Sequence, residues 1–129
     1  MSKGRKIGGW VVTGLLTALF LFSASMKFTG AEEAIAGFEK YGLSHMRLVI
    51  GGGEVASALL YVIPLTASLG VLLLSAYMGG AIVTHMSNAE PYIAQSIILI
   101  LIWLGYYLRY PEMLISFTKT RGTPPGELE

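Results

Sequence analysis

Hydrophobic residues dominate three long stretches of the chain that contain no charged side chain. These stretches are Ile7–Met26, Val55–Thr84 and Pro91–Leu108. A helix needs about 20 apolar residues to cross the hydrocarbon core of a bilayer. The first and last stretches are close to this length, and the middle one exceeds it. Pro64 interrupts the middle stretch, because proline lacks the amide proton that a helix interior needs. The pattern predicts four membrane-spanning helices, at about 7–27, 46–63, 67–86 and 92–109.

A shorter amphipathic segment separates the first two predicted spans. Thr29 and Glu32 match the S/T-x-x-E pattern of a helix N-terminal capping box. Gly42 suits the left-handed residue that follows a helix. Between them, four apolar side chains recur at helical spacing: Ala34, Ile35, Phe38 and Tyr41. We therefore expect a helix at about 30–41 that lies in the membrane interface or packs across the mouth of the bundle.

The composition agrees with a membrane protein and narrows its chemistry. Hydrophobic residues make up 53% of the chain and charged residues 13%, whereas a soluble domain carries about 25% charged residues. The absence of cysteine excludes disulfide exchange, iron–sulfur ligation and thiolate zinc sites within this chain. A net charge of +1 gives no indication of nucleic-acid binding. We expect a single membrane domain, 1–129, that ends in a poorly ordered tail at about 118–129.

Basic residues at the two ends of the chain favour one orientation. Three of them precede the first predicted span and three follow the last: Lys3, Arg5, Lys6, Arg109, Lys119 and Arg121. Because an even number of spans places both termini on one side, the positive-inside rule predicts cytoplasmic termini in a plasma or bacterial inner membrane. The basic start and first apolar run also resemble a secretory signal peptide. That run exceeds the usual 7–15 apolar residues of such a peptide, which favours a retained span.

Glu54 is the most unusual polar residue, because it falls near the middle of the second predicted span. An ionisable side chain at this depth costs about 2.5–3.5 kcal/mol on insertion scales. Its helical stripe includes Gly51, Ser57, Ala58 and Tyr61, so we expect Glu54 to face protein or a cavity. One interpretation is a carboxylate that binds a ligand or a proton. The other is a structural clamp to Lys27 or to a neighbouring hydroxyl.

Polar residues of the other three spans fall in the same outer half of the predicted bundle. Glu54 should lie deeper than His85 by roughly 7 Å, at a rise of 1.5 Å per residue, so water or a ligand would have to connect them. One residue from each span converges on an outward-opening cavity, namely Lys27, Glu54, His85 and Gln95. With Tyr61 from the stripe of Glu54, these are the candidate ligand-binding residues. We assign no catalytic residue. A metal or haem site is disfavoured, because only His45 and His85 could supply histidine nitrogens.

Two further patterns concern helix packing and the bilayer interfaces. Glycines in apolar spans often permit close helix approach, and two small-residue patterns fit this interpretation: Gly53-xxx-Ser57 and Ala76-xxx-Gly80-xxx-Thr84. Arg47 and Arg109 lie at the ends of predicted spans, where we expect them to anchor opposite interfaces.

Several motifs, taken in order, resemble those of the DoxX-like family over most of 13–113. They are Thr-Gly-Leu-Leu followed by Phe-Ser-Ala-Ser-Met-Lys to Lys27, Gly-Phe-Glu-Lys-Tyr-Gly at 37–42, Gly-Gly-Gly-Glu to Glu54, Ile-Pro at 63–64, Tyr-Met-Gly-Gly-Ala-Ile-Val-Thr-His to His85, and Tyr-Leu-Arg-Tyr-Pro at 107–111. The resemblance implies an all-α, four-helix membrane bundle. It also implies a link to redox metabolism, because relatives are named for subunits of a thiosulfate:quinone oxidoreductase and others are associated with quinone detoxification.

The resemblance and the polar residues together suggest a membrane subunit that binds a lipophilic, quinone-like ligand. Lys27 and His85 would donate hydrogen bonds to a carbonyl oxygen of the ligand, and Glu54 would exchange a proton with it. No redox cofactor is expected within the chain apart from a bound quinone. The expected partners are membrane lipid and either a second copy or an oxidoreductase subunit. Two alternatives stay open: a non-catalytic assembly subunit, and an oligomeric transporter of protons or a small solute.

Overall fold

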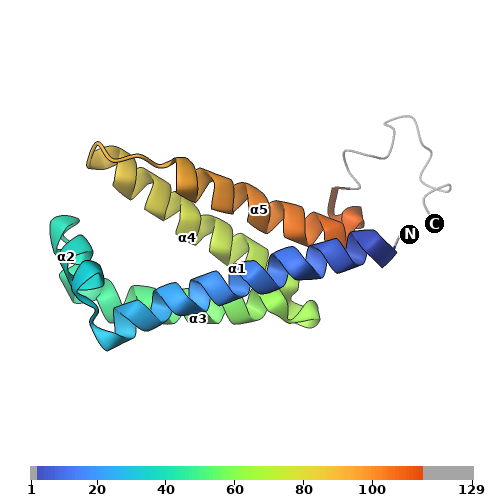
Figure 1. Ribbon diagram of the computed structural model, residues 1–129, viewed down its shortest axis with the longest axis horizontal. Coiled ribbons are helices and arrows are strands. Elements are labelled where there is room, and N and C mark those ends of the chain that lie inside the picture. Colours follow the sequence, from blue (N-terminus) through green and yellow to red (C-terminus); the bar gives the residue numbers. More distant parts are fainter. Residues whose placement is uncertain (1–2, 115–129) are drawn as a thin grey trace.

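Five α-helices form a bundle in the computed structural model, which describes residues 3–114 (Figure 1). Short 3-10 turns at Ser44–Met46, Pro64–Thr66 and Pro111–Leu114 connect or follow the helices. Each of the four long helices overlaps one of the apolar ranges predicted from the sequence, and the predicted tail at 118–129 lies outside the described residues. The helices are α1 (Lys3–Thr29), α2 (Glu32–Lys40), α3 (Arg47–Val62), α4 (Ala67–Ser87) and α5 (Ile93–Arg109).

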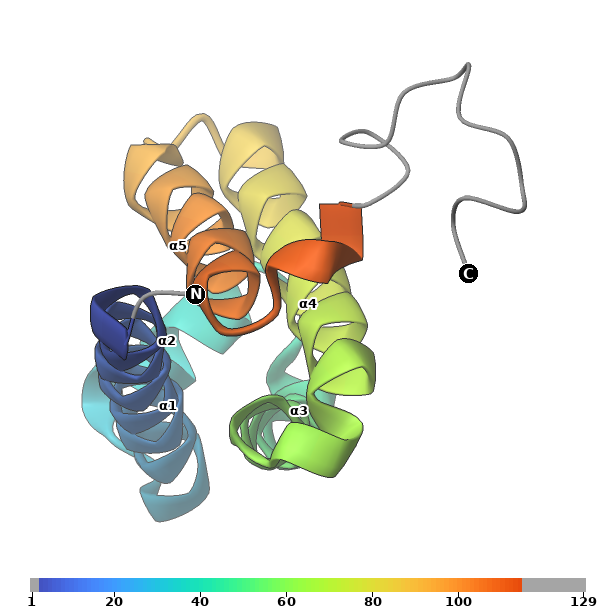
Figure 2. The ribbon, with the colours of Figure 1, turned by 90° about the vertical axis from the view of Figure 1, so that its right-hand side faces the viewer.

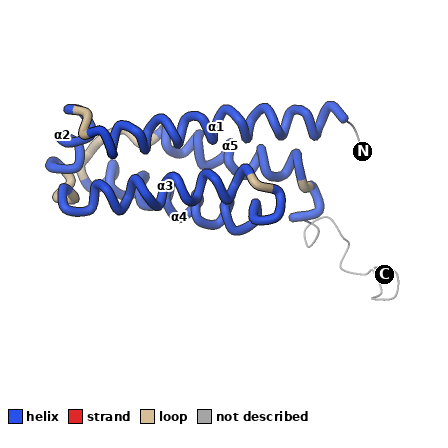
Figure 3. Tube along the Cα trace, turned by 90° about the horizontal axis from the view of Figure 1, so that it is seen from below, coloured by secondary structure: helices blue, strands red, loops and turns tan. Residues whose placement is uncertain are grey.

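The four long helices are arranged as a ring in which each contacts two neighbours. α1 packs against α3 and α5, and α4 packs against the same two helices from the other side. Figure 2 shows this arrangement end-on, and Figure 3 shows the long helices lying along a common direction. The short helix α2 crosses one end of the bundle, and the start of α1 meets the end of α5 at the other (Figure 1).

A tight turn between α3 and α4 brings their backbones into close contact. Ile63 is extended, with φ −78° and ψ 122°, as expected for a residue before proline. Pro64 then starts the 3-10 turn that leads into α4. A Cβ atom added at Gly70 would lie 2.2 Å from the backbone nitrogen of Tyr61. Only glycine permits this approach, so Gly70 fixes the spacing of α3 and α4.

The predicted role of the other small-residue patterns is wrong. A Cβ atom at Gly53, Gly79 or Gly80 would meet no other atom within 4 Å, so these glycines do not bring two helices of this chain together. The residues of the pattern on α4 line a pocket instead: Ala76, Gly80 and Thr84. Small residues spaced four apart show that one face of a helix lacks bulky side chains. They do not show which other helix, if any, packs against that face.

The predicted start of α2 is also wrong, whereas its predicted end is confirmed. α1 continues through Thr29, whose hydroxyl donates to the Ser25 carbonyl at 2.8 Å, and α2 begins after Ala31 without a side-chain cap. A threonine inside a helix commonly bonds back in this way to the carbonyl four residues earlier. At the other end, Gly42 has the predicted left-handed conformation, with φ +71°.

The bundle buries a core of apolar side chains and leaves many other large apolar side chains exposed. Leu16, Leu74 and Ile102 lie in its centre, whereas bulky residues on the outer faces remain uncovered, for example Leu15, Phe22, Leu72 and Ile100. By length and composition, α1 and the segment from Pro64 to Ser87 are able to cross a membrane. α5 is apolar but has 17 residues, and α3 has 16 and contains Glu54. Two of the four predicted spans therefore meet both criteria.

Candidate functional site

The C-terminal end of α1 is joined to the middle of α3 by a buried ion pair. The Lys27 ammonium lies 2.8 Å from the Glu54 carboxylate, and the two side chains are 10% and 1% exposed. Glu54 faces the interior, as predicted, on a stripe whose other members are also buried: Gly51, Ser57, Ala58 and Tyr61. Lys27 also donates to the Ser23 hydroxyl at 2.8 Å. The clamp between Lys27 and Glu54, one of the two interpretations of Glu54, is therefore present.

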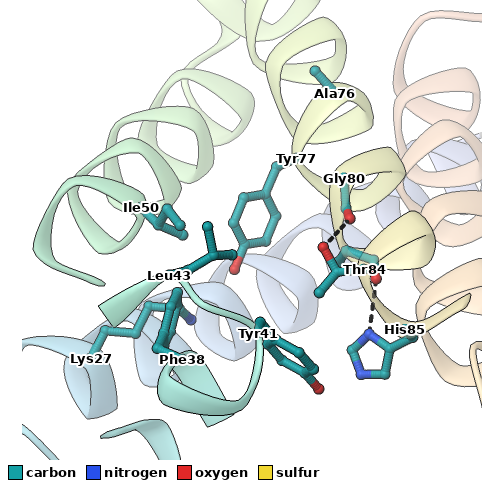
Figure 4. A pocket seen from close by; sticks show the side chains of 11 residues that line it. Lys27, Phe38, Tyr41, Leu43, Ile50, Ala76, Tyr77, Gly80, Thr84 and His85 are labelled. Atoms are coloured by element: carbon teal, nitrogen blue, oxygen red, sulfur yellow. Dashed lines mark hydrogen bonds between the residues drawn. The ribbon is translucent and has the colours of Figure 1, made fainter. Parts of the chain in front are cut away.

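Beside this ion pair lies a pocket of about 420 Å³. Its lining residues come from the end of α1, from α2 and the turn after it, from α3 and from α4. Small side chains of α4 form one wall. Aromatic and aliphatic side chains form the rest of the lining, and they come from α2, the turn after it, α3 and α4: Phe38, Tyr41, Leu43, Ile50 and Tyr77 (Figure 4).

Polar groups lie on two sides of the pocket and between those sides. Lys27 is at one side and His85 at the other, with the Tyr77 hydroxyl pointing into the space between the helices (Figure 4). The Tyr77 hydroxyl also interacts with the Glu54 carboxylate. Glu54 itself does not line the pocket. Tyr77 therefore provides the contact between the buried acid and the pocket.

His85 belongs to a separate polar cluster at the C-terminal end of α4. Its Nδ1 atom lies 2.8 Å from the Ala81 carbonyl, and its Nε2 atom lies 3.3 Å from the Gln95 amide nitrogen. Glu90 is 4.0 Å from the same Nε2 atom. The structure thus brings His85 and Gln95 together, as it does Lys27 and Glu54. The pocket separates the two pairs.

Glu90 fastens α2 to the loop between α4 and α5. It accepts hydrogen bonds from the Lys40 ammonium and from the Tyr41 hydroxyl, the latter at 2.6 Å. These two donors, Lys40 first, hold the pKa of the Glu90 carboxylate below its ordinary value. The same carboxylate raises the pKa of Tyr41, because it stabilises the protonated phenol. We call this set of three residues the Glu90 latch.

The remaining predicted residue, Tyr61, lies away from the pocket. Its hydroxyl donates to the Ile102 carbonyl at 2.8 Å, and its ring lies near the guanidinium of Arg109. The expectation that Arg109 anchors a membrane interface is wrong, because this side chain is buried and the whole residue is 4% exposed. Arg109 donates to the Tyr61 carbonyl at 2.9 Å and stacks on Trp10 at 4.0 Å. Sequence position alone does not reveal these acceptors at the end of α3.

Several pocket residues were not among the sequence-predicted candidates. They are Phe38, Tyr41 and Tyr77, with Glu90 just outside the pocket. The signal for Tyr77 is its spacing from His85 on the same helix, and the signal for Phe38 and Tyr41 is their place on the apolar stripe of α2. Glu90 carries no comparable signal.

Over residues 3–114, no three histidine, aspartate or glutamate side chains come together in a way that would hold a metal ion.

The comparisons with known proteins give one match. A family model described as the DoxX-like family matches residues 11–106, which include both ion-pair partners and all the residues that line the pocket. The searches of curated proteins and of solved structures find no match.

Proposed function

The chain belongs to the DoxX-like family, and on this premise we propose that it is an integral membrane protein that binds a lipophilic, quinone-like ligand in the pocket beside Lys27. In this proposal all four long helices cross the bilayer, both termini are cytoplasmic, and α2 lies at the outer surface. The observation that carries the proposal is the pocket itself, which is mostly apolar and has a small number of polar groups at its sides.

The outer faces of the bundle support the membrane location. Leu15, Phe22 and Leu72 are 69%, 65% and 60% exposed. Soluble monomers seldom expose continuous apolar patches of more than a few hundred Å², whereas the same surface is well suited to acyl chains. α3 and α5 are short for a core of about 30 Å, but the turn at Ser44–Met46 lengthens the α3 segment at its start, and the turn at Pro111–Leu114 follows α5.

The size and lining of the pocket support a small organic ligand. Its volume of about 420 Å³ falls within the 300–1,000 Å³ typical of ligand sites. Ala76 and Gly80 are exposed on the flank of α4, so a ligand dissolved in the bilayer has a lateral route into the pocket. The small residues Ala76 and Gly80 of α4 and the rings of Phe38 and Tyr41 line the same pocket (Figure 4), which favours a ligand that contains a ring.

A pocket-filling substitution tests this proposal. Gly80 lines the pocket and has no atom within 4 Å of an added Cβ, so Gly80→Leu should fold and occupy the ligand space. Gly79 is equally uncrowded but does not line the pocket, which makes Gly79→Leu the matched control. We expect Gly80→Leu to weaken binding of a short-chain ubiquinone analogue and of an alkylphenol at least tenfold. Gly79→Leu should leave both affinities unchanged.

The measurement is calorimetric titration of the protein in lipid nanodiscs, with empty nanodiscs as the blank. Equal affinities in the wild type and in both leucine variants would show that binding occurs elsewhere. No heat of binding above the blank for any ring compound would reject the proposal.

The assembly-subunit alternative is favoured by one observation, namely that Lys27 and Glu54 already satisfy each other inside the chain. If the polar residues serve only helix packing, Glu54→Gln should lower the melting temperature and no ligand should raise it. A ligand-dependent rise in the melting temperature of the wild type that is absent in Gly80→Leu would exclude this alternative.

A further inference from the structure

The hydrogen-bond donors around the pocket are already engaged within the protein. Lys27 directs its ammonium protons to the Ser23 hydroxyl at 2.8 Å, to Glu54 at 2.8 Å and to the Ser23 carbonyl at 3.4 Å. An ammonium group has three protons and no acceptor. A ligand carbonyl could therefore bond to Lys27 only by displacing one of these partners.

In its neutral form the His85 imidazole carries one ring proton, and this proton is already donated within the protein. The Ala81 carbonyl can only accept, so the Nδ1 atom, 2.8 Å away, must carry the ring proton. The Nε2 atom is then an acceptor and receives a hydrogen bond from the Gln95 amide at 3.3 Å. The expected donation from His85 to a ligand carbonyl therefore has no support in this arrangement.

Each of the three hydroxyl groups that line the pocket also faces an acceptor of the protein. Thr84 donates to the Gly80 carbonyl at 2.8 Å, and Tyr41 donates to Glu90 at 2.6 Å. Tyr77 interacts with Glu54, and a phenol beside a carboxylate is the donor. Each hydroxyl oxygen nevertheless keeps lone pairs with which it can accept a hydrogen bond. Among the described pocket residues, acceptors are therefore more available than donors.

The charges beside the pocket cancel as well. The Lys27 ammonium is compensated by Glu54 at 2.8 Å, and Glu90 is compensated by Lys40. Burial of a further unpaired charge between these groups would carry a large desolvation penalty. The pocket is consequently suited to an uncharged ligand.

We propose that the pocket selects an uncharged lipophilic ring compound that carries a hydroxyl group, such as a phenol or hydroquinone, and that the Tyr77 oxygen accepts a hydrogen bond from that hydroxyl. This inference rests on the proposed function and specifies its ligand class: a hydrogen-bond donor in place of the carbonyl acceptor expected from the sequence. The Tyr77 ring packs edge-on against Phe20, with centroids 6.2 Å apart, so the hydroxyl is held in place.

A matched set of ligands tests the donor requirement. The set consists of 4-nonylphenol, its methyl ether 4-nonylanisole, and decylubiquinone, titrated into nanodiscs with empty nanodiscs as the blank. Because one hydrogen bond contributes about 1 kcal/mol net, the phenol should bind roughly fivefold more tightly than the ether. We also expect the phenol to bind more tightly than the quinone.

A single substitution tests the acceptor. Tyr77→Phe keeps the ring and removes the oxygen, so the preference for phenol over ether should disappear while the affinity for the ether stays the same. Tyr92→Phe is the control, because Tyr92 is 41% exposed and does not line the pocket.

The possible results separate this inference from the proposed function. If the ether or the quinone binds as tightly as the phenol, in a manner that Gly80→Leu abolishes, the donor requirement is overturned and the proposed function stands. If none of the three binds, the proposed function itself fails. A preference for phenol that survives in Tyr77→Phe would overturn the assignment of Tyr77 as the acceptor.

Discussion

Lys27 and Glu54 form an ion pair between α1 and α3 in which the carboxylate is almost completely buried and the Nζ–Oε1 distance is 2.8 Å. Neither residue could occupy this interior as a charge without the other, because a buried ion is stable only when it is paired and hydrogen-bonded. The pair links the two helices that enclose one side of the pocket.

Removal of one member of this pair should destabilise the bundle more than removal of both. We expect Lys27→Met or Glu54→Gln alone to lower the free energy of unfolding by about 3–5 kcal/mol, because each single variant disrupts a buried pair. The double variant should recover part of this loss. Thermal unfolding in detergent measures the three stabilities, and a double variant less stable than both single variants would contradict the pairing.

Replacement of Arg109 by lysine should destabilise the bundle. Its guanidinium donates to the Tyr61 carbonyl at 2.9 Å and to the Thr13 hydroxyl at 3.3 Å, and it stacks on the Trp10 ring. A lysine keeps the charge but lacks the planar fork that makes these contacts together. We expect Arg109→Lys to cost about 1–3 kcal/mol, measured by the same unfolding experiment. An unchanged melting temperature would show that the lysine ammonium reaches the same acceptors.

Gly70 and Gly14 should respond oppositely to alanine. At Gly70 the new Cβ would lie 2.2 Å from the Tyr61 backbone nitrogen, whereas at Gly14 it would meet nothing within 4 Å. Gly70→Ala should therefore cost at least the roughly 1–3 kcal/mol of an overpacked core. Gly14→Ala should gain about 0.5–1 kcal/mol, because alanine is the better helix former. The two variants are compared by melting temperature, and a stable Gly70→Ala protein would indicate a wider gap between α3 and α4.

The Glu90 latch should open in acid. Because Lys40 and Tyr41 lower the pKa of Glu90, the interaction is present above the ordinary glutamate pKa of about 4.3 and is lost as the pH falls through the lower folded-state value. The chain has no cysteine, so spin labels at Ala36→Cys and Ser87→Cys report one distance between α2 and the end of α4. This distance should be well defined at neutral pH and broaden in acid.

Two variants complete the latch experiment. Glu90→Gln removes the negative charge and should show the broad distance distribution at every pH, whereas Glu39→Gln leaves the latch intact and should behave as the wild type does. A narrow distribution for Glu90→Gln at neutral pH would mean that other contacts hold α2 in place.

The helices were predictable because their signals are local. Runs of apolar residues, Pro64 and Gly42 each act on a few neighbouring residues, and the structure places helix starts and ends close to them. The inward direction of Glu54 was predictable for the same reason, because helical periodicity fixes which side chains share a stripe. Membership of the DoxX-like family was likewise recognisable from motifs in order along the chain.

The sequence by itself therefore determined the helical segments, their apolar character and the burial of Glu54. Only the tertiary structure decided that Lys27 neutralises Glu54, that Gly80 lines a pocket while Gly70 meets a backbone, and that Arg109 lies inside the bundle. The physical reason is range. Backbone hydrogen bonds and helical periodicity act within a few residues, whereas an ion pair, a cavity or a carbonyl acceptor exists only where segments distant in sequence meet.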